Sequence, residues 1–228
     1  MRRPRPALPV LALAATLACG ALHAQGFSFP QQDDAERRAE AARSARIAEQ
    51  LSTPCRADLL NKKIMVVIGE VQSDGYIVAQ QQNYGPHFEA INARLRSLGL
   101  RTYTPEEIRR QIAQAEIEAY FRNDPDAALA ASKRLGASFV LSGLITATAT
   151  RSMVMAVNQV AVTMDFNLAG SDGRQIATAR ADSASYAGSD VRRMALTLVD
   201  EKADEVVASL YADHCRKAGF AAGGAPRK

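Results

Sequence analysis

Histidine, serine, cysteine and acidic residues all occur in this chain, but at spacings that build no catalytic or metal site. His23, His87 and His214 lie far apart, without the neighbouring Cys, His or Asp ligands that a metal ion requires. Ser142-Gly143 lacks the glycine two places earlier that a nucleophile elbow requires. The glycines are too scattered for a phosphate-binding loop. We therefore predict no cofactor, no metal and no catalytic residue, with an enzyme whose site is unrecognised as the alternative.

The N-terminal stretch, residues 1–24, has the pattern of a secretory signal peptide. A basic head over residues 1–5 precedes an apolar run over residues 7–21, and the small residue Ala24 ends the segment. The apolar run is too short to anchor a protein across a bilayer. We therefore expect an exported, periplasmic protein, with outer-membrane association as an alternative.

The cysteines predict one covalent cross-link. Cys19 lies inside the signal peptide, which leaves Cys55 and Cys215 in the mature chain. An even pair of cysteines in an exported protein is most simply explained by a disulfide, and two unpaired thiols are the alternative. Lipidation of Cys19 is a further alternative, although Leu17 stands one place later than the leucine of the usual lipoprotein signal.

The charge of the chain gives no reason to expect nucleic acid as a partner. Three of the 28 Lys and Arg residues and none of the 24 Asp and Glu residues lie in residues 1–24, so the mature chain has a net charge of +1. The basic isoelectric point therefore belongs largely to the targeting peptide and does not indicate a nucleic-acid-binding surface. Contact with a membrane is expected only if the protein is lipidated or forms a pore.

The mature sequence is organised around one buried strand, predicted over residues 137–150. Gly136 stands where a left-handed residue ends the preceding helix. Apolar and polar residues then alternate, as in a strand with one face towards the core. Gly143 interrupts the apolar face, which indicates a bulge or a close backbone approach. A hairpin turn at residues 171–173 joins two further strands, predicted over residues 153–169 and 175–187.

Strands and helices alternate before this point, and one long helix follows it. The sequence therefore predicts the α/β class: a mixed sheet with strand–helix alternation, then an antiparallel meander and a long C-terminal helix. The predicted organisation is a tether or solvated helix over residues 25–54, a single α/β domain over 55–217, and a disordered tail over 218–228. The expected elements before the central strand are a strand at 62–69, a polar connection at 70–84, a helix at 86–98, a strand at 100–103, and helices beginning at 105 and 126.

Two segments are candidate surfaces for protein–protein contact. The first is an apolar hairpin tip that is either an edge for a partner or part of the core. The second is the polar connection before the first long helix, for which a mobile loop is the alternative. The candidate residues are Met153, Val154, Met155 and Val157 in the tip, and Tyr76, Gln80, Gln81 and Tyr84 in the connection.

Two stretches resemble a known group of proteins. These are Ala-Ala-Ser-Lys-Arg-Leu-Gly-Ala-Ser-Phe-Val-Leu-Ser-Gly-Leu-Ile, ending at Ile145, and Val-Thr-Met-Asp-Phe-Asn-Leu-Ala-Gly-Ser-Asp-Gly-Arg-Gln-Ile over residues 162–176. Together with the first buried strand, they are similar to the bacterial envelope group that includes the curli secretion component CsgG, the penicillin-binding-protein activator LpoB and the flagellar protein FlgT. The resemblance covers residues 60–187 and rests on core and turn positions.

The resemblance implies a function without catalysis. Members of that group assemble rings or pores, or dock on a partner enzyme. We therefore expect a periplasmic scaffold or regulator of an envelope assembly, acting by contact with an envelope protein, with a homo-oligomer as an alternative. A ring- or pore-forming secretion component of the outer membrane is the alternative. This chain departs from the lipoproteins of the group because it lacks their lipid-attachment motif.

Overall fold

The computed structural model describes residues 29–71, 77–79, 85–112, 125–151, 157–187 and 190–220. The chain divides into two units, residues 1–38 and 39–228, and each is described by itself. The described part of the first unit is helical and belongs to α1 (Phe29–Leu51), which begins before the predicted Asp33 and continues into the second unit. Within the first unit, Arg37 forms an ion pair with Asp34, one turn away on the same helix.

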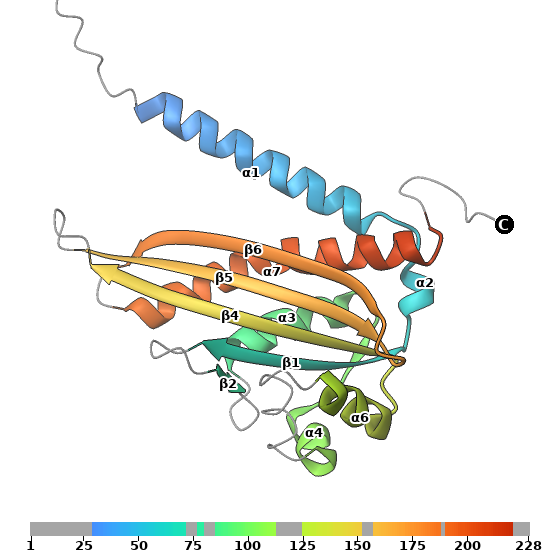
Figure 1. Ribbon diagram of the computed structural model, residues 1–228. Helices are drawn as coiled ribbons and strands as arrows, with labels where there is room; N and C mark the ends of the chain where they lie inside the picture. Colours follow the sequence, from blue (N-terminus) through green and yellow to red (C-terminus); the bar gives the residue numbers. More distant parts are fainter. Residues whose placement is uncertain are drawn as a thin grey trace, which may run out of the picture. The chain divides into compact units, whose positions relative to one another are not determined.

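Six strands in the second unit form one mixed sheet in the order β2-β1-β4-β5-β6, with β3 beside the start of β1 (Figure 1). β1 runs parallel to β3 and β4, and the remaining pairs are antiparallel. The predicted α/β class, with its antiparallel meander and its long C-terminal helix, is confirmed. The strands are β1 (Lys63–Val71), β2 (Ile77–Ala79), β3 (Arg101–Thr102), β4 (Phe139–Arg151), β5 (Asn158–Gly170) and β6 (Gln175–Ala187).

Helix boundaries follow local sequence signals. Thr104 and Glu107 form a reciprocal capping box at the start of α4. Gly136 has a φ of 65°, so the left-handed residue predicted after α6 is present. The helices of the second unit are α2 (Arg56–Leu59), α3 (Pro86–Ser97), α4 (Pro105–Gln111), α6 (Pro125–Leu135) and α7 (Val191–Lys217), together with the last part of α1.

Two apolar layers hold the sheet between helices. α3 and α7 cover one face, to which β1, β4, β5 and β6 all contribute side chains. α4 and α6 cover the other face over β1 and β4, where Met65 and Val140 belong to the same buried cluster as Ile108 and Leu135. β1 is therefore buried on both faces, which explains why its sequence is apolar without alternation.

Two predicted boundaries were wrong. The strand expected from Met153 begins instead at Asn158, which pairs with Arg151 at the end of β4, and the described Val157 lies outside the strand. The connection predicted over residues 70–84 contains β2, which pairs antiparallel with the end of β1. β2 has only three residues, too few for the alternation that identifies a strand in sequence.

An aromatic ring lies over a glycine in the middle of the sheet. Gly143 of β4 is paired with Phe166 of β5. A Cβ atom added to Gly143 would lie 2.2 Å from Cε1 of Phe166, closer than two carbon atoms can approach. The bulge or close backbone approach predicted at Gly143 is not what the structure shows: the ladder runs in register through Gly143, and the group close to it is the buried side-chain ring of Phe166.

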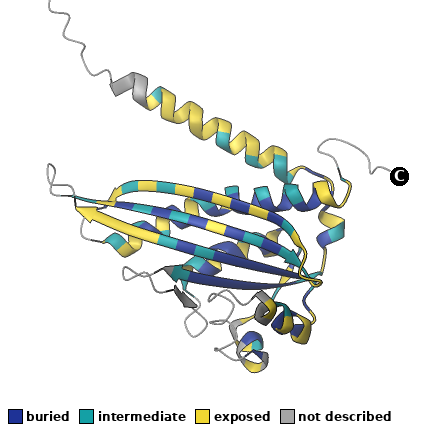
Figure 2. Cartoon of the chain, in the orientation of Figure 1, coloured by how far each residue is buried: buried dark blue, intermediate teal, exposed yellow. Residues whose placement is uncertain are grey.

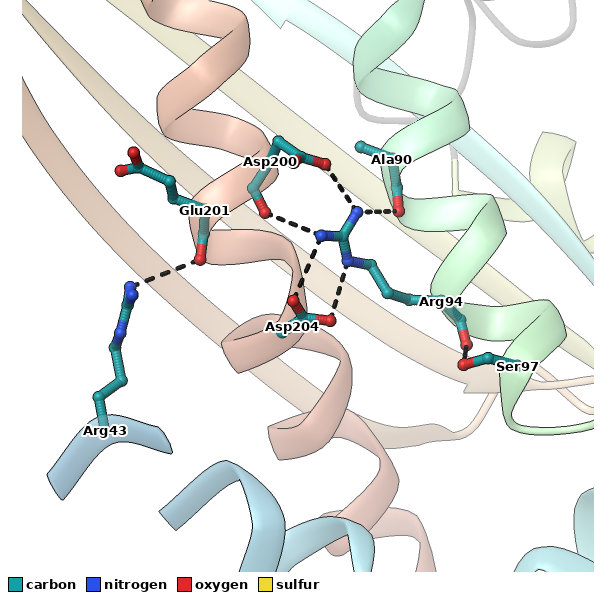
Figure 3. A network of polar contacts seen from close by, with 7 residues as sticks. All are labelled: Arg43, Ala90, Arg94, Ser97, Asp200, Glu201 and Asp204. Atoms are coloured by element: carbon teal, nitrogen blue, oxygen red, sulfur yellow. Dashed lines mark hydrogen bonds and ion pairs between the residues drawn. The ribbon is translucent and has the colours of Figure 1, made fainter. Parts of the chain in front are cut away.

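An arginine fixes α3 to α7 within the helical layer (Figure 3). The Arg94 guanidinium donates to Asp200 Oδ1 at 2.8 Å and to Asp204 Oδ1 at 3.0 Å, and also to the backbone carbonyls of Ala90 and Asp200. Burial alone would lower the pKa of Arg94, but these hydrogen bonds to the two aspartates outweigh it and raise the pKa. Arg94 therefore stays charged and holds the two helices at one register.

Candidate functional site

The start of the second unit's compact body is tied to the end of α7 by a covalent bond. Cys55 and Cys215 form a disulfide with a Cα–Cα distance of 5.7 Å, and both are fully buried. The Tyr211 hydroxyl donates to the Thr53 carbonyl and accepts from the Cys55 N–H at 3.3 Å. The chain entering the domain is thus fastened to α7 by one covalent and two hydrogen bonds.

Asp58 adds a charged link at the same place. Its carboxylate accepts from Lys62 Nζ at 3.0 Å and lies 3.0 Å from His214 Nε2. Burial works to raise the pKa of Asp58, but the hydrogen bonds and positive charge of Lys62 and His214 outweigh it, so that the pKa is lowered. An Asp–His pair is also found in catalytic triads, yet the His214 ring here packs edge-on against Phe139 and is buried. Its geometry suits a structural link.

We expect replacement of Asp58 by asparagine to make stability less sensitive to acid. The folded pKa of Asp58 lies below its unfolded value, so its contribution is present above about pH 4 and is lost as the pH falls through the folded pKa. Because a third of the side chain is exposed (34%), we expect an effect of only about 0.5 kcal/mol. Urea unfolding of the wild type and D58N between pH 7 and pH 3 measures it. Parallel curves for the two proteins would contradict the prediction.

Most residues of the predicted contact surface lie outside the described part of the chain. These are Tyr76, Gln80, Gln81, Tyr84, Met153, Val154 and Met155. Val157 is described and is half-buried immediately before β5. The elements that flank both segments are described, and they define where the segments leave the fold. Glu70 near the end of β1 and His87 at the start of α3 lie 2.7 Å apart (Oε1 to Nδ1) and bracket the second segment.

The described residues on either side of the segment with Met153 form one end of three paired strands, of which the β4 part is exposed. We call residues 147–151 of β4, 158–162 of β5 and 183–187 of β6 the distal ribbon. β1 pairs with β4 only as far as Thr146 among the described residues. Beyond that point all five β4 residues, from Ala147 to Arg151, are exposed (Figure 2). The other half of the same strand is buried.

The distal ribbon offers backbone groups and small side chains. β4 here reads Ala-Thr-Ala-Thr-Arg; across the ladder on β5, Ala161 and Gln159 alternate with the buried Val160 and Val162. The large exposed side chain is Tyr186 on β6, with 56% of its surface accessible. An unpaired strand edge with small side chains lets another chain approach and form main-chain hydrogen bonds. The ribbon is suited to protein contact more than to chemistry on a small molecule.

Sequence reasoning did not identify the exposed part of β4. The run Thr146-Ala147-Thr148-Ala149-Thr150 has the right period for a strand, yet neither face of it is apolar. That absence of a core face could have indicated a strand segment whose side chains are exposed.

The described histidine and serine side chains that could take part in chemistry lie in structural contacts. In the described part of the chain no group of three or more His, Cys, Asp or Glu side chains could hold a metal ion. A cavity of about 20 Å³ between the sheet, α3 and α7 is lined by apolar side chains together with Tyr211 and His214, and it has room for about one water molecule. Ser142 is buried and its hydroxyl donates to the Asn167 carbonyl at 3.3 Å, as expected of a strand residue. Of the helices that the structure describes, none combines the length and apolar character needed to cross a membrane.

Comparison with known proteins finds distant structural likenesses. No protein-family model matches the sequence, and no curated protein is significantly similar to it in sequence. The PelC dodecamer from Paraburkholderia phytofirmans is 18% identical, with 71% of this chain and 93% of that chain covered and a TM-score of 0.39. A minor lipoprotein from Acinetobacter baumannii is 12% identical, with coverages of 67% and 94% and a TM-score of 0.40. The LpoB C-terminal domain from Salmonella enterica is 14% identical, with coverages of 58% and 94% and a TM-score of 0.37. Likeness at this level does not extend to activity or partner.

Proposed function

We propose that this protein is an exported, periplasmic and non-enzymatic component of an envelope assembly, which acts by binding another envelope protein through the distal ribbon. The observation that carries the proposal is the exposure of β4 from Ala147 to Arg151, beyond the end of β1. The pattern of residues 1–24 supports export, and the disulfide between Cys55 and Cys215 fits an oxidising compartment.

The two halves of β4 differ in burial, and this difference supports binding by the exposed half. The half of β4 that lies between the two helical layers packs its side chains into the protein's own core. The distal half of β4 has no buried residue, whereas Val160 and Val162 opposite it on β5 belong to the core, so the exposed β4 side chains contribute little to stability. A strand whose edge pairs with no described residue beyond Thr146 is the kind of edge to which another chain can add a strand. The apolar tip residues Met153 and Met155 follow directly and would supply side-chain contacts to a partner.

Site-specific photocrosslinking in the cell envelope tests the proposal. We expect a photoreactive residue at Thr148 or Thr150 to crosslink a defined partner protein. Arg174 is the matched control, because it lies by the turn at the other end of β5 and β6 and its side chain is 88% exposed. Equal crosslinking from Arg174, or none from the ribbon, would overturn the proposal.

We expect the double variant M153S/M155S to lose the ribbon crosslink while it keeps its fold. The physical reason is that two apolar contacts with the partner are removed, whereas the domain's own core is untouched if the tip is a contact surface. Circular dichroism and thermal unfolding of the purified variant provide the control. An unfolded variant would show that the tip belongs to the core.

A further inference from the structure

The outer edge of the sheet, formed by β6, is long and has no further described strand beside it. β6 (Gln175–Ala187) is 13 residues long and is the last strand in the sheet order. Its ladder pairs it with β5 on one side, and α7 packs across its inner face. No further helix or strand of the described chain packs extensively against β6. Its outer backbone groups are therefore available for another strand.

The usual devices that protect such an edge are missing from β6. Its sequence contains no lysine and no proline, and its charged residues are Arg180 and Asp182. Both are exposed and both lie on the face turned away from α7, on either side of the buried Ala181. The remaining residues between Ala177 and Ser185 are Ala, Ser and Thr, which are too small to keep another strand away.

The two charges have different surroundings within one chain. Arg180 lies opposite Asp165 of β5, with 3.4 Å between Nη1 and Oδ1. Asp182 lies opposite Thr163 and forms no ion pair with any described residue. One carboxylate at the free edge thus lacks a cation, while a cation stands two residues away on the same face.

We propose that two copies of this chain join antiparallel along β6, in a register centred on Ala181. In this register Arg180 of one copy faces the partner's Asp182, and the reverse pair forms symmetrically. Each Arg180 then lies between Asp165 of its own chain and the partner's Asp182. A parallel pairing in register would place each charge opposite its like, so charge complementarity selects the antiparallel dimer. On the other face of the paired strands, Ala179 lies opposite the partner's Ser183. Both side chains are small, which leaves space for the two backbones to approach.

A charge-reversal series tests this pairing on the exported mature protein. Sedimentation velocity is expected to show a dimer for the wild type. D182R places arginine opposite Arg180 at both ends of the register, and the dissociation constant should rise about tenfold or more. The double variant R180D/D182R restores opposite charges and should dimerise like the wild type.

Mixing the two single variants makes the test specific for register. R180D carries two acidic residues on its edge and D182R carries two basic ones, so each should be monomeric alone and the mixture should form a heterodimer. D165N is the matched control, since it removes the neighbour of Arg180 within the chain and leaves the dimer intact. Thermal unfolding confirms that every variant is folded.

A wild type that stays monomeric at 100 micromolar, or a D182R variant that dimerises like the wild type, would overturn the proposal. So would a mixture of the single variants that fails to associate. These outcomes leave partner binding by the distal ribbon untouched, because that proposal rests on crosslinks at Thr148 and Thr150 to a different protein.

Discussion

Replacing Gly143 by alanine will destabilise the protein by about 3 kcal/mol, because the new methyl group has no space. The added Cβ would lie 2.2, 2.6 and 2.9 Å from three atoms of the Phe166 ring. Phe166 is itself 3% exposed and is packed in the main core under α7, so its ring cannot swing into solvent. Either the ring leaves its rotamer or β4 and β5 move apart. Urea denaturation of wild type and G143A measures the loss as a shift of the midpoint.

A second substitution separates this clash from a general effect on the strand. Shortening the ring in the double variant G143A/F166L should cost less than the sum of the two single changes, because the methyl group then occupies the space that the ring vacates. Effects of strand propensity are controlled at Ala147, which lies on the same face of β4 as Gly143 but is exposed, so that A147V should change stability by less than about 0.5 kcal/mol. Strictly additive costs for the double variant would contradict the clash.

Removing the disulfide should lower the free energy of unfolding by about 2–5 kcal/mol. The bond closes a loop with a sequence separation of 160, so it restricts the unfolded chain strongly. The variant C55S/C215S avoids leaving a lone thiol, and urea unfolding of this variant beside the oxidised wild type measures the difference. The D58N variant is a useful comparison, since it weakens the same junction without freeing the chain.

Thiol labelling of the unreduced protein checks that the bond forms in the cell. We expect the exported protein, unfolded in denaturant without reductant, to take up no alkylating reagent. Reduction before labelling should add two alkyl groups. Uptake of two groups without reduction would show that Cys55 and Cys215 are free thiols in the cell.

The order of elements could be predicted because each boundary has a local cause. Thr104 caps a helix whatever lies around it, and Gly136 adopts a φ of 65° that few other residues tolerate. The limits of β6, Gln175 and Ala187, were predicted correctly, because the turn fixes one end of the strand and its alternating burial continues to the other. Signals of this kind depend on a few neighbouring residues.

The features that were missed depend on residues far apart in the chain. The pairing of β2 with β1 is visible only once the connection folds back, and no pattern in three residues indicates it. The partner of Gly143 is Phe166, which the sequence does not identify as the residue across the ladder. The exposure of β4 beyond Thr146 depends on where β1 stops, and the free edge of β6 depends on the order of strands. The contact surfaces proposed here follow from tertiary structure.

The bond between Cys55 and Cys215 also determines how the domain would carry mechanical load. A pull on the segment before Cys55 reaches the bond before it reaches β1, which starts at Lys63. The covalent link passes the force into the C-terminal end of α7, the longest helix of the described domain. The force therefore does not act directly on the hydrogen bonds that pair β1 with the rest of the sheet. Reduction would transfer the same load to the α2 turn and to the first hydrogen bonds of β1, so an oxidised protein should resist pulling far better than a reduced one.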